Sequence, residues 1–148
     1  MNSKLVRTLT VGAIAVGAAA MAQAQQHEPA EQNVDAGKYE YDRHCAECHG
    51  LSGKGDGPFV QLLRSGTVMP NLTELSQKNG GVFPFTRVYG TIDGTVRVRA
   101  HGSRIGMPIW GEVYQTESRN LSPIYNPDVF ARAKILALIE YIYRLQEK

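Results

Sequence analysis

Apolar residues recur at helical spacing near the end of the chain, which predicts one long C-terminal helix. Asn126, Pro127 and Asp128 stand where a helix takes an N-cap, a first helical residue and an acid in its first turn. We expect this helix to continue to about Gln146. Its apolar positions are Val129, Ala133, Leu136, Ile139 and Tyr143, and the face is broadened by Ile135, Leu138 and Ile142.

A second helix is predicted from Asp35 onward. Either Asn33 or Asp35 can serve as its N-cap, because both side chains carry an oxygen that can accept a hydrogen bond from the first turn. Gly37, Tyr41 and Cys45 then follow at intervals of four residues, so they share one face of the helix. That face is expected to pack against another element.

Only short elements are predicted between these two helices. One or two helical turns are expected over Phe59 to Arg64, and Thr73 is expected to cap a short helix that reaches about Lys78. Gly80-Gly81 would stop that helix, and another would cover Pro84 to Tyr89. The stretch "TVRVRAH" alternates apolar and basic residues, which indicates a brief extended segment that is too isolated to form a sheet.

The first 24 residues have the pattern of an export signal. Lys4 and Arg7 precede an uncharged run from Thr8 to Ala22, and "AQA" at its end offers small residues for cleavage. The run is rich in Gly and Ala and falls short of the roughly 20 strongly apolar residues of a membrane span. We therefore expect a signal peptide at 1–24 and a mature protein in the periplasm of a Gram-negative bacterium, without a membrane span.

The mature chain is expected to hold a flexible polar lead-in at residues 25–34 and a single domain at residues 35–148. Removal of the signal takes away two bases and no acids, so the 16 Lys and Arg become 14 and balance the 14 Asp and Glu. The mature protein is thus near neutral and has no basic run, which argues against a nucleic-acid partner.

The stretch "CAECHG" holds the only two cysteines of the chain, Cys45 and Cys48. A disulfide, a redox-active dithiol, half of a zinc site and a covalent anchor for haem are the four hypotheses. A zinc site would need a second pair of ligands, which the sequence lacks. A thioredoxin-type dithiol normally follows a β-strand, and no residues before Cys45 alternate as a strand would. A disulfide between Cys45 and Cys48 would close too small a loop to stabilise the fold much.

Haem attachment accounts for every member of the Cys-x-x-Cys-His motif, and we favour it over the other three hypotheses. On a helical turn the Cys45 and Cys48 thiols can each add to a haem vinyl group. His49 then lies under the iron as its proximal ligand. The sequence therefore predicts one haem c as cofactor, with its iron.

With these residues in view, the chain resembles a class I cytochrome c over most of residues 35–146. The family has a glycine eight residues before the first haem cysteine and an aromatic four before it, which Gly37 and Tyr41 match. Its last helix carries a leucine and an aromatic three apart, matched by Leu138 and Tyr141. The resemblance implies an all-α fold in which the N- and C-terminal helices cross, with short helices and loops wrapped around one covalent haem.

Further roles are implied by the resemblance alone. Pro58 is similar to the family proline that ends the glycine-rich loop and orients the proximal histidine, and "GMPIWG" resembles the methionine loop of the distal face. Basic and aromatic residues near this loop are the candidates for holding the haem propionates. These candidates are Arg97, Arg99, Arg104 and Trp110.

Met107 is the predicted sixth ligand of the iron. Met69 is its main competitor, because both methionines precede a proline, which suits a loop that presents a side chain. Met69, however, is only 20 residues from His49 and belongs to a segment similar to the one that wraps the haem edge in the family. His101 could replace Met107 and would give a lower potential. His27 lies in the lead-in, and His44 is tethered on the proximal side.

Ligation by His and Met leaves no vacancy for a substrate, so the resemblance implies a one-electron carrier rather than an enzyme. The expected partners are redox proteins that donate and accept its electron, such as a respiratory complex, an oxidase or a dehydrogenase. One alternative is a haem subunit docked on a periplasmic dehydrogenase or oxidase. Another is a peroxidase or gas-sensing haem protein with a displaceable sixth ligand.

Overall fold

The computed structural model describes residues 34–63, 68–96 and 106–147, and every regular element in these ranges is helical. This confirms the prediction of an all-α fold. In chain order the elements are α1 (Ala36–His44), α2 (Ala46–His49), η1 (Pro58–Leu62), η2 (Leu72–Glu74), η3 (Gln77–Asn79), α3 (Phe85–Asp93), α4 (Trp110–Leu121) and α5 (Pro127–Arg144). Within the described ranges, no helix is both long and apolar enough to cross a membrane.

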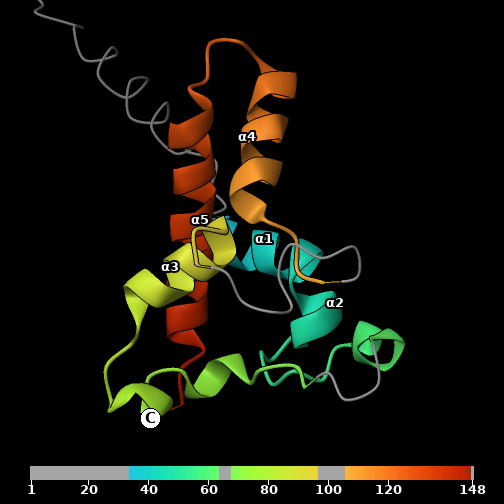
Figure 1. Cartoon of the computed structure of the whole chain (residues 1–148), viewed down its shortest axis with the longest axis vertical. Coiled ribbons are helices and arrows are strands. Elements are labelled where there is room, and N and C mark those ends of the chain that lie inside the picture. The colour runs from blue at the N-terminus through green and yellow to red at the C-terminus, as the bar shows by residue number, and fades with distance from the viewer. Residues whose placement is uncertain (1–33, 64–67, 97–105, 148) are drawn as a thin grey trace, which may run out of the picture. The chain divides into compact units, whose positions relative to one another are not determined.

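α1 and α5 cross at Gly37, as the sequence predicted (Figure 1). A Cβ added to Gly37 would lie 2.1 Å from the carbonyl oxygen of Ala137, so only glycine permits this approach. The rings of Tyr41 and Tyr141 pack beside the crossing with their centroids 5.1 Å apart. Leu138 is fully buried there. The crossing fixes the N-terminal helix, and with it the segment that follows, against the last helix.

α5 begins where the sequence predicted, because Asn126 Oδ1 accepts hydrogen bonds from the amides of Asp128 and Val129 at 3.0 and 3.2 Å. It ends at Arg144, two residues before the expected end. The predicted apolar face was partly wrong. The buried residues are Ala131, Ile135, Leu138, Ile139, Tyr141 and Ile142, whereas Val129, Ala133, Leu136 and Tyr143 are exposed. Apolar residues cover much of α5, and the crossing with α1 selects which side of it is buried.

α4 was not predicted, although it packs along α5 in the most extensive contact between any two helices of the described chain (Figure 1). Its buried face consists of Trp110, Tyr114 and Ser118 at intervals of four residues, together with Gly111. The remaining positions are mainly polar, so the apolar stripe of this helix is narrow. Its aromatic residues carry the packing, with the Trp110 and Tyr114 rings 5.4 Å apart.

The short elements differ from their predictions at the ends. The expected helix from Thr73 to Lys78 is two short 3-10 turns, η2 and η3, and Asn71 is the cap, because its Oδ1 accepts from the Thr73 amide and hydroxyl. Gly80 ends η3 as predicted. The remaining differences are that η1 starts at Pro58 and ends at Leu62, and that α3 continues four residues past Tyr89 to Asp93. Most of the expected extended segment, residues 97–101, lies outside the described residues.

Candidate functional site

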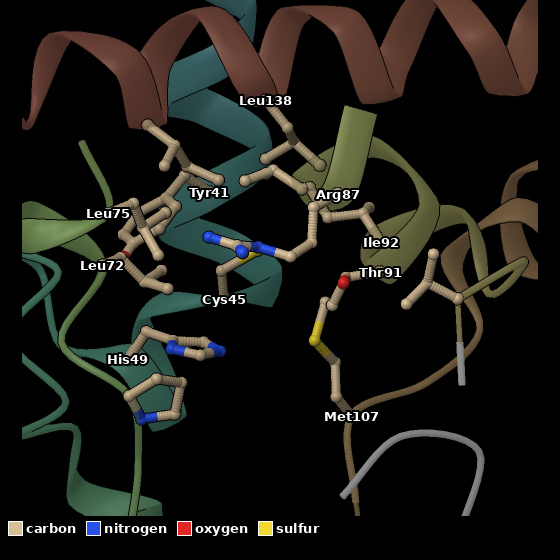
Figure 2. Close-up of a pocket in the computed structure, with 14 residues that line it drawn as sticks. Tyr41, Cys45, His49, Leu72, Leu75, Arg87, Thr91, Ile92, Met107 and Leu138 are labelled. Atoms are coloured by element: carbon tan, nitrogen blue, oxygen red, sulfur yellow. The ribbon is translucent and has the colours of Figure 1, made fainter. Parts of the chain in front are cut away.

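The helices enclose an apolar cavity of about 270 Å³ (Figure 2). Its walls come from α1, α2, α3, α5, the segment around η2 and the segment before α4. The lining residues are Tyr41, Cys45, His49, Pro70, Leu72, Leu75, Arg87, Val88, Thr91, Ile92, Val96, Met107, Leu138 and Ile142. Three residues predicted to bind the cofactor, Cys45, His49 and Met107, are therefore brought to one cavity.

His49 is the last residue of α2, and its side chain lies at the cavity wall. The residue is only 8% exposed. The glycine-rich loop folds back onto α2, since Gly55 N donates to the His49 carbonyl at 2.8 Å and Gly57 N to the Cys48 carbonyl at 3.2 Å. The Tyr41 hydroxyl donates to the Gly50 carbonyl at 2.8 Å and joins the loop to α1. The imidazole is thus mounted on backbone that is held on two sides.

The two cysteines stand in different environments and are not joined by a disulfide. Burial, followed by the negative charge of Glu40, raises the pKa of the Cys45 thiol to about 12. Burial and then Glu47 also raise the pKa of Cys48, which is less enclosed and does not line the cavity. Both are therefore protonated thiols at neutral pH, which argues against a reactive thiolate of the redox-dithiol type.

Met107 enters the cavity from the side opposite His49 (Figure 2). Its position depends on the junction of α3 and α4. A Cβ on Gly94 would lie 2.4 Å from Ile109 Cγ2, so Ile109 can pack on the end of α3 only because Gly94 has no side chain. Met69, the competing methionine, does not line the cavity, although the next residue, Pro70, does. The arrangement favours Met107 over Met69 as a ligand.

Arg87 is a cavity residue that the sequence analysis did not single out. Its side chain extends from α3 across the cavity (Figure 2), and among the described lining residues it is the only Lys or Arg. Thr91, one turn further along α3, also lines the cavity. No motif in the sequence marks either residue, because their position depends on how α3 packs against α5. Their four-residue spacing, on the same helix face, is the only sequence signal.

The other predicted cofactor-binding residues lie away from the cavity or outside the described residues. Trp110 is buried, but it packs against His44 and Tyr114 and does not line the cavity. Pro58 is exposed at the start of η1 and is also absent from the lining. The propionate candidates Arg97, Arg99 and Arg104 fall outside the described residues, as does the competing ligand His101.

The residues around the cavity fit a covalently held haem. Half of the lining residues are Leu, Ile or Val, which suits the apolar body of a porphyrin, and a thiol stands at the wall for thioether formation. An imidazole and a thioether sulfur face one another, and these are two of the groups that bind haem iron in proteins. The Arg87 guanidinium would pair with a propionate carboxylate of the haem.

Comparison with known proteins gives one family match. Residues 34–94 match the model of the Cytochrome c family, a range that includes α1, the Cys-x-x-Cys-His segment and α3. No match was found among curated proteins or among solved structures. The match and the Cys-x-x-Cys-His motif within it show that residues 34–94 carry a Cytochrome c domain, of the family whose members transfer electrons by means of a covalently bound haem c.

Proposed function

We propose that this protein is a one-electron carrier with a single haem, whose iron is bound by His49 and Met107. The observation that carries the proposal is that these two side chains enter the same apolar cavity from opposite sides, with Cys45 at its wall (Figure 2). When bound, the haem iron supplies the gain and loss of one electron. Two protein ligands leave no position for a substrate, which favours a carrier over a peroxidase or gas sensor.

The surroundings of the cavity suit this task. The thioether of Met107 is a soft ligand that favours the reduced iron, so the potential is expected at the upper end of the range for haem proteins. The apolar walls exclude water and disfavour the additional charge of the oxidised form, which acts in the same direction. His49 sits on backbone fixed by hydrogen bonds. A ligand that is held in place needs little rearrangement when the electron moves.

Arg87 is proposed to hold a haem propionate, because it is the cation that lines the cavity among the described residues. A guanidinium can bind a carboxylate through two parallel hydrogen bonds, so it would orient the haem as well as neutralise it. Arg97, Arg99 and Trp110 remain predicted contributors from the resemblance to the family. Pro58 likewise remains the predicted residue that orients His49.

The proposed location is the periplasm, reached by means of the signal at residues 1–24. The partners would be redox proteins that deliver and remove the electron, either in free encounters or with this protein docked as a subunit. Intact-mass measurement of the exported protein should give a chain that begins near Gln25 and carries one haem. A full-length chain in the membrane fraction would contradict the proposal on location.

The ligands are tested by the red-end sulfur-to-iron charge-transfer band of the oxidised protein. We expect Met107→Ala to abolish this band. Met69→Leu and His101→Ala are the matched controls and should keep it. Loss of the band in Met69→Leu instead, or its absence from the unmodified protein, would contradict Met107 as the ligand.

The carrier function has a separate test on the same holoprotein. A redox titration should follow a one-electron curve for one haem. The reduced protein should not change its spectrum on exposure to carbon monoxide, because both axial positions are filled. Carbon monoxide binding without denaturant would favour the alternative with a displaceable sixth ligand.

A further inference from the structure

A partly buried ion pair joins α1 to α5 beside the haem attachment segment. The Glu40 side chain is only 8% exposed, and its Oε1 accepts a hydrogen bond from Lys134 Nζ at 2.8 Å. Lys134 also donates to both carboxylate oxygens of Glu117 on α4, at 2.9 and 3.1 Å. The Tyr114 hydroxyl donates to the other Glu40 oxygen at 3.2 Å. Two carboxylates thus share one ammonium group among three helices.

The hydrogen bonds of Lys134 favour its charged form inside the fold. Burial alone would lower the pKa of Lys134, but its hydrogen bonds to Glu40 and then Glu117 outweigh this and raise it. The Lys134 ammonium also lies over the rings of Tyr114 and Phe130, at 5.1 and 5.3 Å from their centroids. Aromatic faces attract a cation, so these contacts add to the hold of the carboxylates on Lys134.

Glu40 lies close to the segment that carries the haem. It stands five residues before Cys45 on the first helix, and its Oε2 is 3.8 Å from the Nε2 of His44, the residue that precedes Cys45. The Glu40 charge acts on the Cys45 thiol strongly enough to add to the effect of burial on its pKa. The electrostatic field of the pair therefore extends to the cavity wall where the haem is attached.

A buried ion pair is not needed for stability, because an apolar pair of similar volume is often as stable. Its field, in contrast, acts differently on the two oxidation states of a nearby iron. A negative charge favours the oxidised form, which carries one more positive charge, and a positive charge favours the reduced form. In the interior such effects are weakly screened.

We propose that Glu40 and Lys134 set the reduction potential of the haem, with Lys134 offsetting the negative charge that Glu40 places beside Cys45. Both are positioning residues that act through their charge. The biological role of this adjustment rests on the proposed carrier function, because the reduction potential of a carrier must suit those of its partners. The shift in potential itself requires only that haem is bound in the cavity.

The test is a redox titration of the purified holoprotein and its variants at neutral pH. Glu40→Gln keeps the shape of the side chain and should favour the reduced form by about tenfold, which for one electron is a rise of about 59 mV. Lys134→Met should shift the equilibrium by a similar factor in the opposite direction. The matched control is Lys38→Met, which removes the same charge from the surface of α1, where the side chain is 53% exposed. It should change the equilibrium less than twofold.

Opposite signs separate an electrostatic effect from a loosened fold. A fold that admits water would lower the potential in both variants, so shifts in the same direction would overturn the proposal. The proposal would also be overturned if the shift in potential of Glu40→Gln or of Lys134→Met were no larger than that of Lys38→Met. If Lys134→Met does not hold haem, Lys134→Gln keeps a donor for both carboxylates and is expected to give the same downward shift.

The sulfur-to-iron band of each variant keeps this result distinct from the test of the carrier function. Loss of the band in the unmodified protein would reject His/Met ligation and leave the shifts measurable. A preserved band with unchanged potentials would reject the role of Glu40 and Lys134 alone.

Discussion

The side-chain amide of Gln146 donates a hydrogen bond to the backbone carbonyl of Leu72, with 2.7 Å between Nε2 and O. The same amide group accepts from the Ser76 backbone N–H at 2.8 Å through Oε1. Next to it, the Glu147 amide donates to the Thr73 carbonyl at 2.8 Å. The C-terminal residues thus hold the segment around η2, whose Leu72 and Leu75 form part of the cavity wall.

Gln146→Glu is expected to weaken this attachment, although the two side chains have the same shape. Gln146 Nε2 also donates to the Ile142 carbonyl at 2.9 Å, so the new carboxylate oxygen would face two carbonyls instead of donating to them. The expected loss is about 1–3 kcal/mol of unfolding free energy, measured by denaturant titration of the holoprotein. Glu147→Gln is the control, because it keeps the backbone bond and removes only an exposed ion pair with Lys54. An equal loss there would contradict the assignment.

The crossing of α1 and α5 predicts that Gly37→Ala destabilises the protein. Alanine favours a helix over glycine by roughly 1 kcal/mol, but the added Cβ would be 2.1 Å from the Ala137 carbonyl oxygen, and the helices must separate. We expect a net loss of about 1–3 kcal/mol, as for other overpacked sites. Ala36→Leu, at an exposed position of the same helix, should have little effect. A Gly37→Ala melting temperature at or above that of the unmodified protein would be inconsistent with the crossing.

The sequence predicts those parts of the fold that have local signals. The Asn126 cap starts α5, Gly37 marks the helix crossing, and the Cys-x-x-Cys-His spacing marks the haem segment. α4 was not predicted, although its apolar residues recur at helical spacing, at Trp110, Val113, Tyr114 and Leu121; the other positions are mainly polar, so this apolar stripe is narrow. The side on which α5 is buried was misassigned because its apolar residues fit more than one face.

The candidate site was predictable in part for the same reason. Cys45 and His49 belong to one motif, so their proximity follows from the sequence, whereas the approach of Met107 depended on the family resemblance. Arg87 carries no motif and faces the cavity only because of how α3 packs. Glu40 and Lys134 are 94 residues apart and meet only through the crossing of α1 and α5. Tertiary packing decides such contacts, and one sequence does not report them.

Asp35 gives a prediction on pH. Its pKa is lowered from the usual 3.8 by the Lys38 backbone N–H that it accepts as N-cap and by its ion pair with Arg144. A lowered folded-state pKa means that the charge stabilises the protein above about 3.8 and that this contribution is lost as the pH falls through the lower folded value. Asp35→Asn keeps the cap but removes the charge, so it should be less stable than the unmodified protein at pH 7.

The difference in unfolding free energy between Asp35→Asn and the unmodified protein should shrink below pH 4. Denaturant titrations at several pH values measure it. Glu140→Gln serves as the control, since Glu140 is the more distant and 72% exposed carboxylate beside Arg144 and should contribute less. A difference that is constant from pH 7 to pH 2 would show that the Asp35 charge has no part in it.

Covalent attachment is the property that separates a c-type cytochrome from one that holds its haem by contacts alone. Cys45 and Cys48 are each expected to form one thioether, so Cys45→Ser or Cys48→Ser should leave a single bond and the double variant none. Acid-acetone extraction should then leave haem on the unmodified chain and both single variants, and remove it from the double variant. The mass of each extracted chain checks the result directly, because each addition to a vinyl group leaves the haem bound without loss of atoms.

The two single variants should also differ in stability, because Cys45 lines the cavity and Cys48 does not. Loss of the buried Cys45 thioether should lower the thermal stability of the holoprotein more than loss of the Cys48 thioether. Retention of haem by the double variant after extraction would rule out both thioethers as the anchors.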